Sequence, residues 1–156
     1  MKAAKIVPWV FAFVAVAALV FAVRAPAQGL SLAYDGKPEI VAATFASEWC
    51  PACKVLEPNL AEVIPGFAGE PVTFIVFDFT FGERKEVAEL ADANGVGEIY
   101  ARNKGATGFT LLIDADTGEI IDTLTMNFSQ KAMRAAIARA ISIASHTDNT
   151  PPAPAI

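Results

Sequence analysis

The chain has little of several residue types on which common enzyme sites depend. Its 156 residues include one histidine, His146, and two cysteines, Cys50 and Cys53. The only histidine lies at the edge of the C-terminal tail, which argues against a Ser-His-Asp set, and it leaves zinc without the ligands it needs beside two sulfurs. No glycine-rich phosphate loop follows an apolar segment. The sequence therefore does not indicate triad hydrolysis, zinc binding or nucleotide binding, and we expect His146 to be exposed to solvent.

Basic residues are also scarce. Twelve Lys and Arg stand against seventeen Asp and Glu, a net charge of -5. Three of the basic residues lie in the first 27 positions, which contain no acid, so the remainder has nine basic and seventeen acidic residues, a net charge of -8. Because nucleic-acid binding depends on positive charge, we expect no nucleic-acid partner.

Residues 1–27 predict either a signal peptide or an N-terminal membrane anchor. Lys2 and Lys5 precede an uncharged apolar stretch over residues 6–23, and Ala25-Pro26-Ala27 offers a small-x-small cleavage site. The length of the stretch and the charge at Arg24 favour a retained membrane tether instead. Both alternatives stay open. Either one places the rest of the chain outside the cytoplasm, in the periplasm or an equivalent compartment.

The rest of the sequence predicts one α/β domain over residues 28–145 and a disordered Pro-rich tail over 146–156. Apolar residues dominate 39–46 and 72–79, as expected for strands buried on both faces of a sheet. A β-hairpin is predicted over residues 109–113 and 119–125, which are joined by the turn Asp114-Ala115-Asp116-Thr117-Gly118. We therefore expect a central mixed sheet of about four strands.

Helices are expected where apolar residues recur at spacings of three and four. They cover 51–63, which contains Pro58, then 83–93, and a final helix capped by Ser129. The stretch 95–105 is either an added flap beside the cysteines or an extension of the preceding helix. The predicted element order is β-α-β-α-β-β-α.

The two cysteines lie where the first strand ends and the first helix begins. A disulfide closing so short a loop removes little entropy from the unfolded chain, so the pair indicates redox chemistry. Unpaired N–H groups at the helix start favour a thiolate at Cys50, and thiols in such motifs have pKa values between about 3.5 and 7.5. Cys53 lies one turn further on and should be more buried. We expect Cys50 to be the nucleophile and Cys53 the resolving thiol, with no cofactor beyond a Cys50–Cys53 disulfide.

The motif Trp49-Cys50-Pro51-Ala52-Cys53-Lys54, with Pro58 five residues after Cys53, resembles the active site of the thioredoxin family. The resemblance covers about residues 38–145 and implies a thioredoxin-like fold and thiol-disulfide oxidoreductase activity. It also implies exported protein thiols or disulfides as partners, with a membrane protein as electron donor. Pro51 and Ala52 are expected to tune the redox potential, and Trp49 to contact the substrate.

Two positions depart from the family. Thr44 replaces a buried aspartate that moves protons for the inner thiol, and Phe109 replaces a cis-proline in a loop that faces the cysteines. In the family, the residue before the proline pairs its backbone with the substrate chain, so Gly108 and Phe109 are expected substrate contacts. A cis peptide before a residue other than proline costs about 3 kcal/mol, so Gly108–Phe109 should be trans. Glu48 is a nearby carboxylate, which we expect to be solvated in the loop.

Two other functions remain open at this stage. The two thiolates could bind Cu(I), which accepts low coordination numbers, in a metal delivery module. Alternatively, Cys50 and Cys53 could form a permanent disulfide in a binding domain. Apart from this Cu(I) alternative, we assign no residue as a metal ligand.

Overall fold

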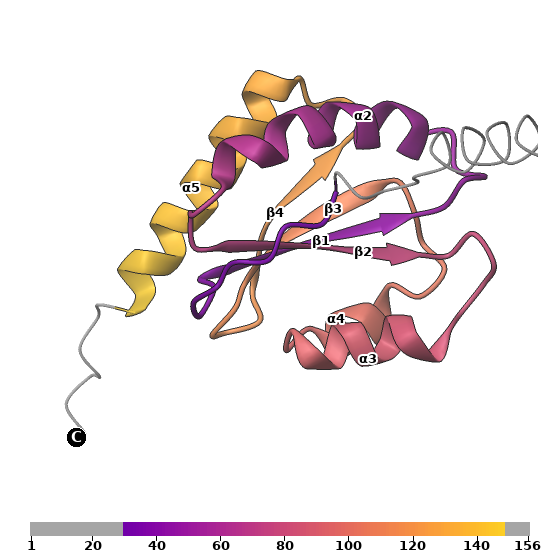
Figure 1. The fold of residues 1–156 in the computed structure, drawn as a ribbon, viewed down its shortest axis with the longest axis horizontal. Helices are drawn as coiled ribbons and strands as arrows, with labels where there is room; N and C mark the ends of the chain where they lie inside the picture. Colours follow the sequence, from indigo (N-terminus) through magenta and orange to yellow (C-terminus); the bar gives the residue numbers. More distant parts are fainter. Residues whose placement is uncertain (1–29, 149–156) are drawn as a thin grey trace, which may run out of the picture.

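The computed structural model describes residues 30–148 (Figure 1). The predicted signal or anchor over 1–27 lies outside this range, as does most of the predicted tail. Within residues 30–148, no helix is long and apolar enough to cross a membrane.

A four-stranded sheet with the order β2-β1-β3-β4 forms the centre of the domain. Strand β1 pairs in parallel with β2, and it pairs antiparallel with β3, which pairs antiparallel with β4. These strands agree with the predicted segments to within one residue at each end. Their bounds are Ile40–Ala46 for β1, Val72–Asp78 for β2, Phe109–Asp114 for β3 and Ile120–Thr125 for β4.

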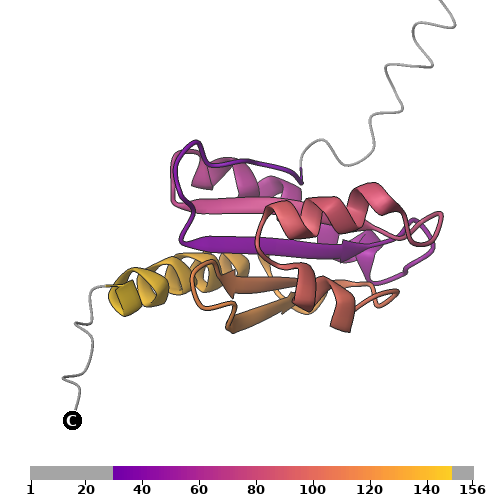
Figure 2. The same ribbon diagram turned by 90° about the horizontal axis from the view of Figure 1, so that it is seen from below.

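Helices cover both faces of the sheet (Figures 1 and 2). Helices α2 (Cys53–Val63) and α5 (Gln130–Asp148) pack together on one face, and α3 (Lys85–Ala93) and α4 (Gly97–Arg102) on the other. A short 3-10 turn, η1 (Ile64–Phe67), follows α2. The predicted mixed-sheet α/β architecture is confirmed, because the strand order and connectivity are those of a thioredoxin-like fold.

Two apolar clusters fill the space between the sheet and its helices. Successive side chains of a strand point to opposite faces. In β1, Ile40 and Ala42 therefore pack towards α2 and α5, whereas Val41, Ala43 and Phe45 pack towards α3 and α4. This two-sided burial explains why β1 is apolar almost throughout.

Three boundaries differ from those predicted. Helix α2 begins at Cys53, and Pro51 and Ala52 form the turn before it. The stretch 95–105 is neither a flap nor a helix extension: Gly95, with φ of 71°, separates α3 from the short helix α4, which buries Ile99 and Tyr100 in the core. Helix α5 continues to Asp148, so it includes the first three residues of the predicted tail.

The start of α5 agrees with prediction. The Ser129 hydroxyl accepts a hydrogen bond from the Ala132 N–H at 3.3 Å, which satisfies one of the free donors at the helix start.

The packing of α2 predicts unequal effects of two aliphatic truncations on the same helix. Leu60 is fully buried, whereas Val55 is 47% exposed. We expect Leu60→Ala to lower the free energy of unfolding by about 2 to 5 kcal/mol, because it removes buried apolar atoms and leaves a cavity. Val55→Ala should change it by less than about 1 kcal/mol. Urea titration followed by circular dichroism measures both, and equal losses would contradict the packing described.

Candidate active site

The turn between β1 and α2 holds the two cysteines close together. Both are free thiols, Cys50 being 9% exposed and Cys53 2% exposed. The Cys53 N–H donates a hydrogen bond to Cys50 Sγ over 3.2 Å. The pair packs with Ala46 at the end of β1 and with Val76 of β2. The parallel pairing of β1 and β2 thus places both sulfurs at the carboxyl ends of these strands.

Hydrogen bonds stabilise the thiolate of Cys50. Partial burial opposes ionisation, but hydrogen bonds from the Cys53 and Thr107 side chains and from the N–H groups of Cys53 and Ala52 outweigh it. They hold the pKa of Cys50 below the ordinary value of a cysteine thiol. The expected thiolate stabilisation at the helix start therefore has identified donors.

Cys53 is shifted in the opposite direction. Burial, a hydrogen bond with Cys50 and the charges of Cys50 and Glu57 raise the pKa of Cys53 to about 12. Its Sγ also lies 4.0 Å from the Phe45 carbonyl oxygen. At neutral pH the site therefore combines one readily ionised outer thiol with one protonated inner thiol.

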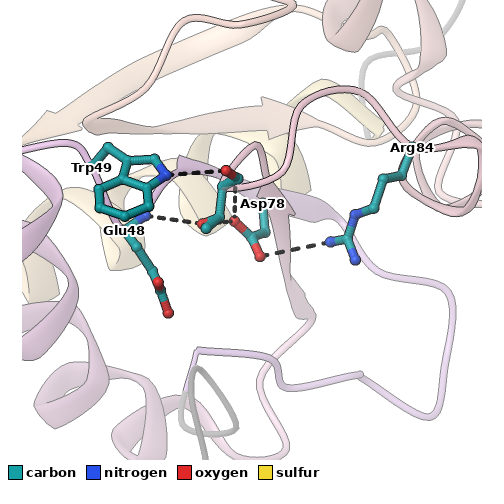
Figure 3. Close-up of polar contacts among 5 residues, drawn as sticks. Glu48, Trp49, Asp78 and Arg84 are labelled. Carbon is teal, nitrogen blue, oxygen red and sulfur yellow. Dashed lines mark hydrogen bonds and ion pairs between the residues drawn. The ribbon is translucent and has the colours of Figure 1, made fainter.

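A polar network attaches the loop before Cys50 to the end of β2 (Figure 3). The Trp49 indole Nε1 donates to the Thr80 carbonyl oxygen at 3.1 Å, and the Glu48 N–H donates to Thr80 Oγ1 at 3.0 Å. Thr80 in turn donates its hydroxyl and its N–H to Asp78 Oδ1, at 2.5 and 2.8 Å. Arg84 lies 3.6 Å from the other carboxylate oxygen of Asp78. The network fixes the Trp49 ring, which remains 75% exposed beside Cys50.

The Glu48 carboxylate takes no part in this network. Its side chain points away from Asp78 (Figure 3), and the residue is exposed. It is thus the solvated loop residue that we expected.

Gly108 brings backbone directly against the outer thiol. Its φ is 98°, and a Cβ atom there would lie 3.2 Å from Cys50 Sγ and 2.9 Å from Ala52 Cβ. Any larger residue would be strained and would crowd the sulfur. The Gly108 N–H donates to the Phe45 carbonyl oxygen at 2.8 Å, so this loop is tied to the end of β1.

Phe109 lies elsewhere than expected. No described peptide bond is cis, which confirms the trans expectation for Gly108–Phe109. Phe109 begins β3, and its ring stacks on Phe45 at 4.9 Å among the side chains facing α3 and α4. Because side chains alternate along a strand, Gly108 lies against Cys50 while Phe109 points to the other face. The structure therefore brings Gly108, but not Phe109, to the cysteines.

Thr44 pairs with another buried hydroxyl. Its Oγ1 lies 2.8 Å from Thr110 Oγ1, and both residues are buried. No carboxylate occupies this position of β1.

Two residues near the cysteines escaped the sequence reasoning. Thr107 supplies a hydrogen bond to Cys50, and only the tertiary approach of its loop reveals it. Glu57 lies four residues after Cys53 on α2 and forms a side-chain hydrogen bond with Cys53. Its spacing of one helical turn was a signal available in the sequence.

The only histidine and the possible metal-binding groups were also considered as candidate sites in the sequence. His146 is exposed on α5, as predicted, where its Nδ1 contacts the Ser142 carbonyl oxygen at 2.5 Å. Across residues 30–148, no three or more His, Cys, Asp or Glu side chains gather in a group that could hold a metal ion.

Comparisons with known proteins give structural neighbours only. No protein-family model and no curated protein matches the sequence. StoA from Bacillus subtilis is 18% identical, with 65% of this chain and 84% of that chain covered and a TM-score of 0.46. The first thioredoxin domain of mouse protein disulfide-isomerase A4 is 18% identical, with coverages of 82% and 84% and a TM-score of 0.45. A Malassezia sympodialis thioredoxin is 21% identical, with coverages of 68% and 80% and a TM-score of 0.43.

These TM-scores lie below 0.5, and the strand order and connectivity of this chain define its fold. Fold and site together define a thioredoxin-like α/β domain with a C-x-x-C pair at the first strand-to-helix junction.

The opposite shifts of the two thiols predict selective alkylation. In the reduced protein, iodoacetamide should modify Cys50 with a pH midpoint below about 8.5, the usual thiol value, while Cys53 stays unmodified well into alkaline pH. Mass spectrometry of the alkylated peptides measures both. Cys53→Ala should raise the Cys50 midpoint, because it removes a side-chain hydrogen bond. Equal midpoints for the two cysteines in the wild type would contradict the described asymmetry.

The approach of Gly108 to the sulfur predicts a steric effect of one methyl group. We expect Gly108→Ala to lower the thermal unfolding midpoint and to slow the alkylation of Cys50, because the methyl group would crowd Sγ. Gly105→Ala is the matched control: its φ is 76°, but nothing lies within 4 Å of the added atom. It should carry only the backbone strain, about 1 to 2 kcal/mol, without an effect on alkylation. Indistinguishable alkylation rates would show that Gly108 does not shape access to Cys50.

Proposed function

We propose that the chain is an exported thiol-disulfide oxidoreductase that works by exchange through Cys50 and Cys53. The observation that supports this most directly is the opposite electrostatic environment of two thiols joined by one N–H···Sγ hydrogen bond. A permanent structural bridge requires no such difference. Stepwise exchange requires an attacking thiolate and a second thiol held in reserve.

The exchange takes place in two displacements. The Cys50 thiolate attacks one sulfur of a substrate disulfide, forming a mixed disulfide and releasing the other substrate sulfur as a thiolate. Cys53 then loses its proton and attacks Cys50 Sγ, which forms the Cys50–Cys53 disulfide and releases the second substrate thiolate. The substrate disulfide gains two electrons and the cysteine pair loses them. The reverse sequence oxidises a substrate dithiol.

Substrate contact in this proposal differs from that of the family the motif resembles. The Gly108 N–H is already bonded to Phe45, so it is not available to pair with a substrate carbonyl. The exposed surface beside Cys50 includes Trp49 and Pro51, while the half-buried Ala52 lies against Gly108. We therefore assign recognition to side-chain contacts with Trp49 and Pro51.

The proposed compartment and partners follow from the sequence. Lys2, Lys5 and the apolar residues 6–23 support export, either with cleavage near Ala27 or with retention as a tether. The substrates would then be exported protein thiols or disulfides, and a membrane protein would supply or accept the electrons. Cu(I) binding by the same two thiolates is the competing function, and the following assay separates the two.

A reductase assay with insulin and dithiothreitol tests the proposal. The wild type should accelerate insulin reduction well above the uncatalysed rate, and Cys50→Ser should return it to that rate. Cys53→Ser should accumulate a mixed disulfide at Cys50, visible by mass spectrometry, because nothing resolves it. Wild-type turnover at the background rate together with tight one-to-one Cu(I) binding would overturn the proposal in favour of metal delivery. A reduction potential below about -300 mV with an unreactive Cys50 would indicate an inert bridge.

A further inference from the structure

The second displacement requires a proton acceptor for Cys53, which the two cysteines alone do not supply. Cys53 must lose its proton before it can attack Cys50, yet burial, the largest cause, helps to raise its pKa in the reduced protein to about 12. The part of that shift that comes from Cys50 is absent once Cys50 is bonded to the substrate, but burial and the charge of Glu57 still hold the pKa of Cys53 above the ordinary value of a thiol. On β1, Thr44 offers only a hydroxyl group, which is bonded to the hydroxyl of Thr110 on β3, and β1 carries no carboxylate.

A carboxylate does reach Cys53 from its own helix. Residues four apart on a helix lie on the same face, which places Glu57 one turn beyond Cys53. Glu57 is half-buried, and its carboxyl group shares a hydrogen bond with the Cys53 side chain. Cys53 itself is 2% exposed, so bulk water has little direct access to its sulfur.

Strand β2 supplies a second carboxylate, Asp78, whose charge acts on Glu57. Asp78 pairs in register with Ala46, and its side chain lies on the same face of β2 as Val76, which packs against the cysteines. Two hydrogen bonds from Thr80 and the nearby Arg84 hold the Asp78 carboxylate in place. Cys53, Glu57 and Asp78 therefore form one electrostatically coupled cluster, built from α2 and β2.

The cluster adjusts Glu57 for proton exchange. Burial raises the pKa of Glu57, the hydrogen bond with Cys53 lowers it, and the negative charge of Asp78 raises it, with a net upward shift. A carboxyl group with a raised pKa is a better base towards a thiol than an ordinary glutamate. Glu48 is not part of the cluster: it is exposed, and its side chain points away from Asp78 (Figure 3).

We infer that Glu57 is the general base that removes the Cys53 proton during resolution of the mixed disulfide, and the general acid that returns it in the reverse reaction. This inference rests on the proposed exchange function. The carboxylate accepts the proton as the Cys53 sulfur forms its bond to Cys50 Sγ. The bond between Cys50 and the substrate sulfur breaks, and the leaving sulfur takes the electron pair. Glu57 then passes the proton to solvent at its exposed edge.

Biphasic reaction of the reduced full chain with dithiobis(nitrobenzoic acid) tests this assignment. The first nitrothiophenolate released reports the attack by Cys50, and the second reports resolution by Cys53, so stopped-flow absorbance separates the two steps. In Glu57→Gln we expect the second phase at pH 7 to slow about 100-fold, within the range of general-base contributions. The first phase should stay within about two-fold of wild type. The deficit should shrink with rising pH, as hydroxide replaces the missing base.

The sign of the effect distinguishes a base from a nearby charge. The negative charge of Glu57 helps to raise the pKa of Cys53. If that charge were its only influence, Glu57→Gln would favour the Cys53 thiolate and accelerate the second phase. Glu62→Gln is the matched control, since it makes the same charge change at an exposed position of α2 and should leave both phases unchanged.

The outcomes separate cleanly. A second phase that is faster, or slowed by less than about ten-fold, or slowed equally with the first phase, overturns the role of Glu57. Absence of the first phase in the wild type contradicts the proposed function itself. If Glu57→Gln does not fold, Glu57→Asp decides, because its carboxyl group is set back by one methylene. Slowing confined to the second phase then supports the inference, and an unchanged second phase overturns it.

Discussion

The end of strand β1 at Phe45 is the point on which the rest of the site depends. Its carbonyl oxygen accepts a hydrogen bond from the Gly108 N–H and lies 4.0 Å from Cys53 Sγ. Its ring contacts Phe77, Phe79 and Phe109 on the opposite face of the sheet. One buried residue thus joins the inner thiol, the loop that approaches the outer thiol and the aromatic core under α3 and α4. Because the backbone is held from both sides, the positions of the sulfurs follow from the packing of the core.

The site differs from the family that its motif resembles in where it places polar groups. The position of a buried acid on β1 carries Thr44, whose hydroxyl bonds to Thr110, and a carboxylate reaches Cys53 instead from α2. A hydroxyl pair satisfies its own hydrogen bonds inside the core, whereas an isolated buried carboxylate is costly. Glu57 avoids most of that cost because it remains partly exposed. The loop before β3 differs as well. The Gly108 N–H bonds to the Phe45 carbonyl within the chain, and the missing side chain at Gly108 leaves space at Cys50 Sγ.

The sequence predicted most elements because their signals are local. Apolar β1 and β2, the Asp-rich turn of the hairpin and the Ser129 cap each carry their own pattern, and all are present in the structure. Failures occurred where a competing interaction decided the outcome. The segment 95–105 forms a separate helix because Ile99 and Tyr100 find space in the core, and Phe109 turns away because its ring stacks on Phe45. Neither contact has a signature at short sequence separation.

The sequence by itself determined that two cysteines three positions apart stand at a strand-to-helix junction, flanked by Trp49 and a helix containing Pro58. It also determined the acidic charge and the single histidine, which restrict the chemistry to the thiols and carboxyl groups. The helix start already indicated Cys50 as the thiol that ionises readily, but only the tertiary structure decided which groups donate hydrogen bonds to it, which loop lies against it and how deeply Cys53 and Glu57 are buried. The physical reason is that burial and hydrogen bonding set the free energy of a charge. Both arise when β2, α2 and the loop at Gly108 meet around the end of β1, far apart though they are along the chain.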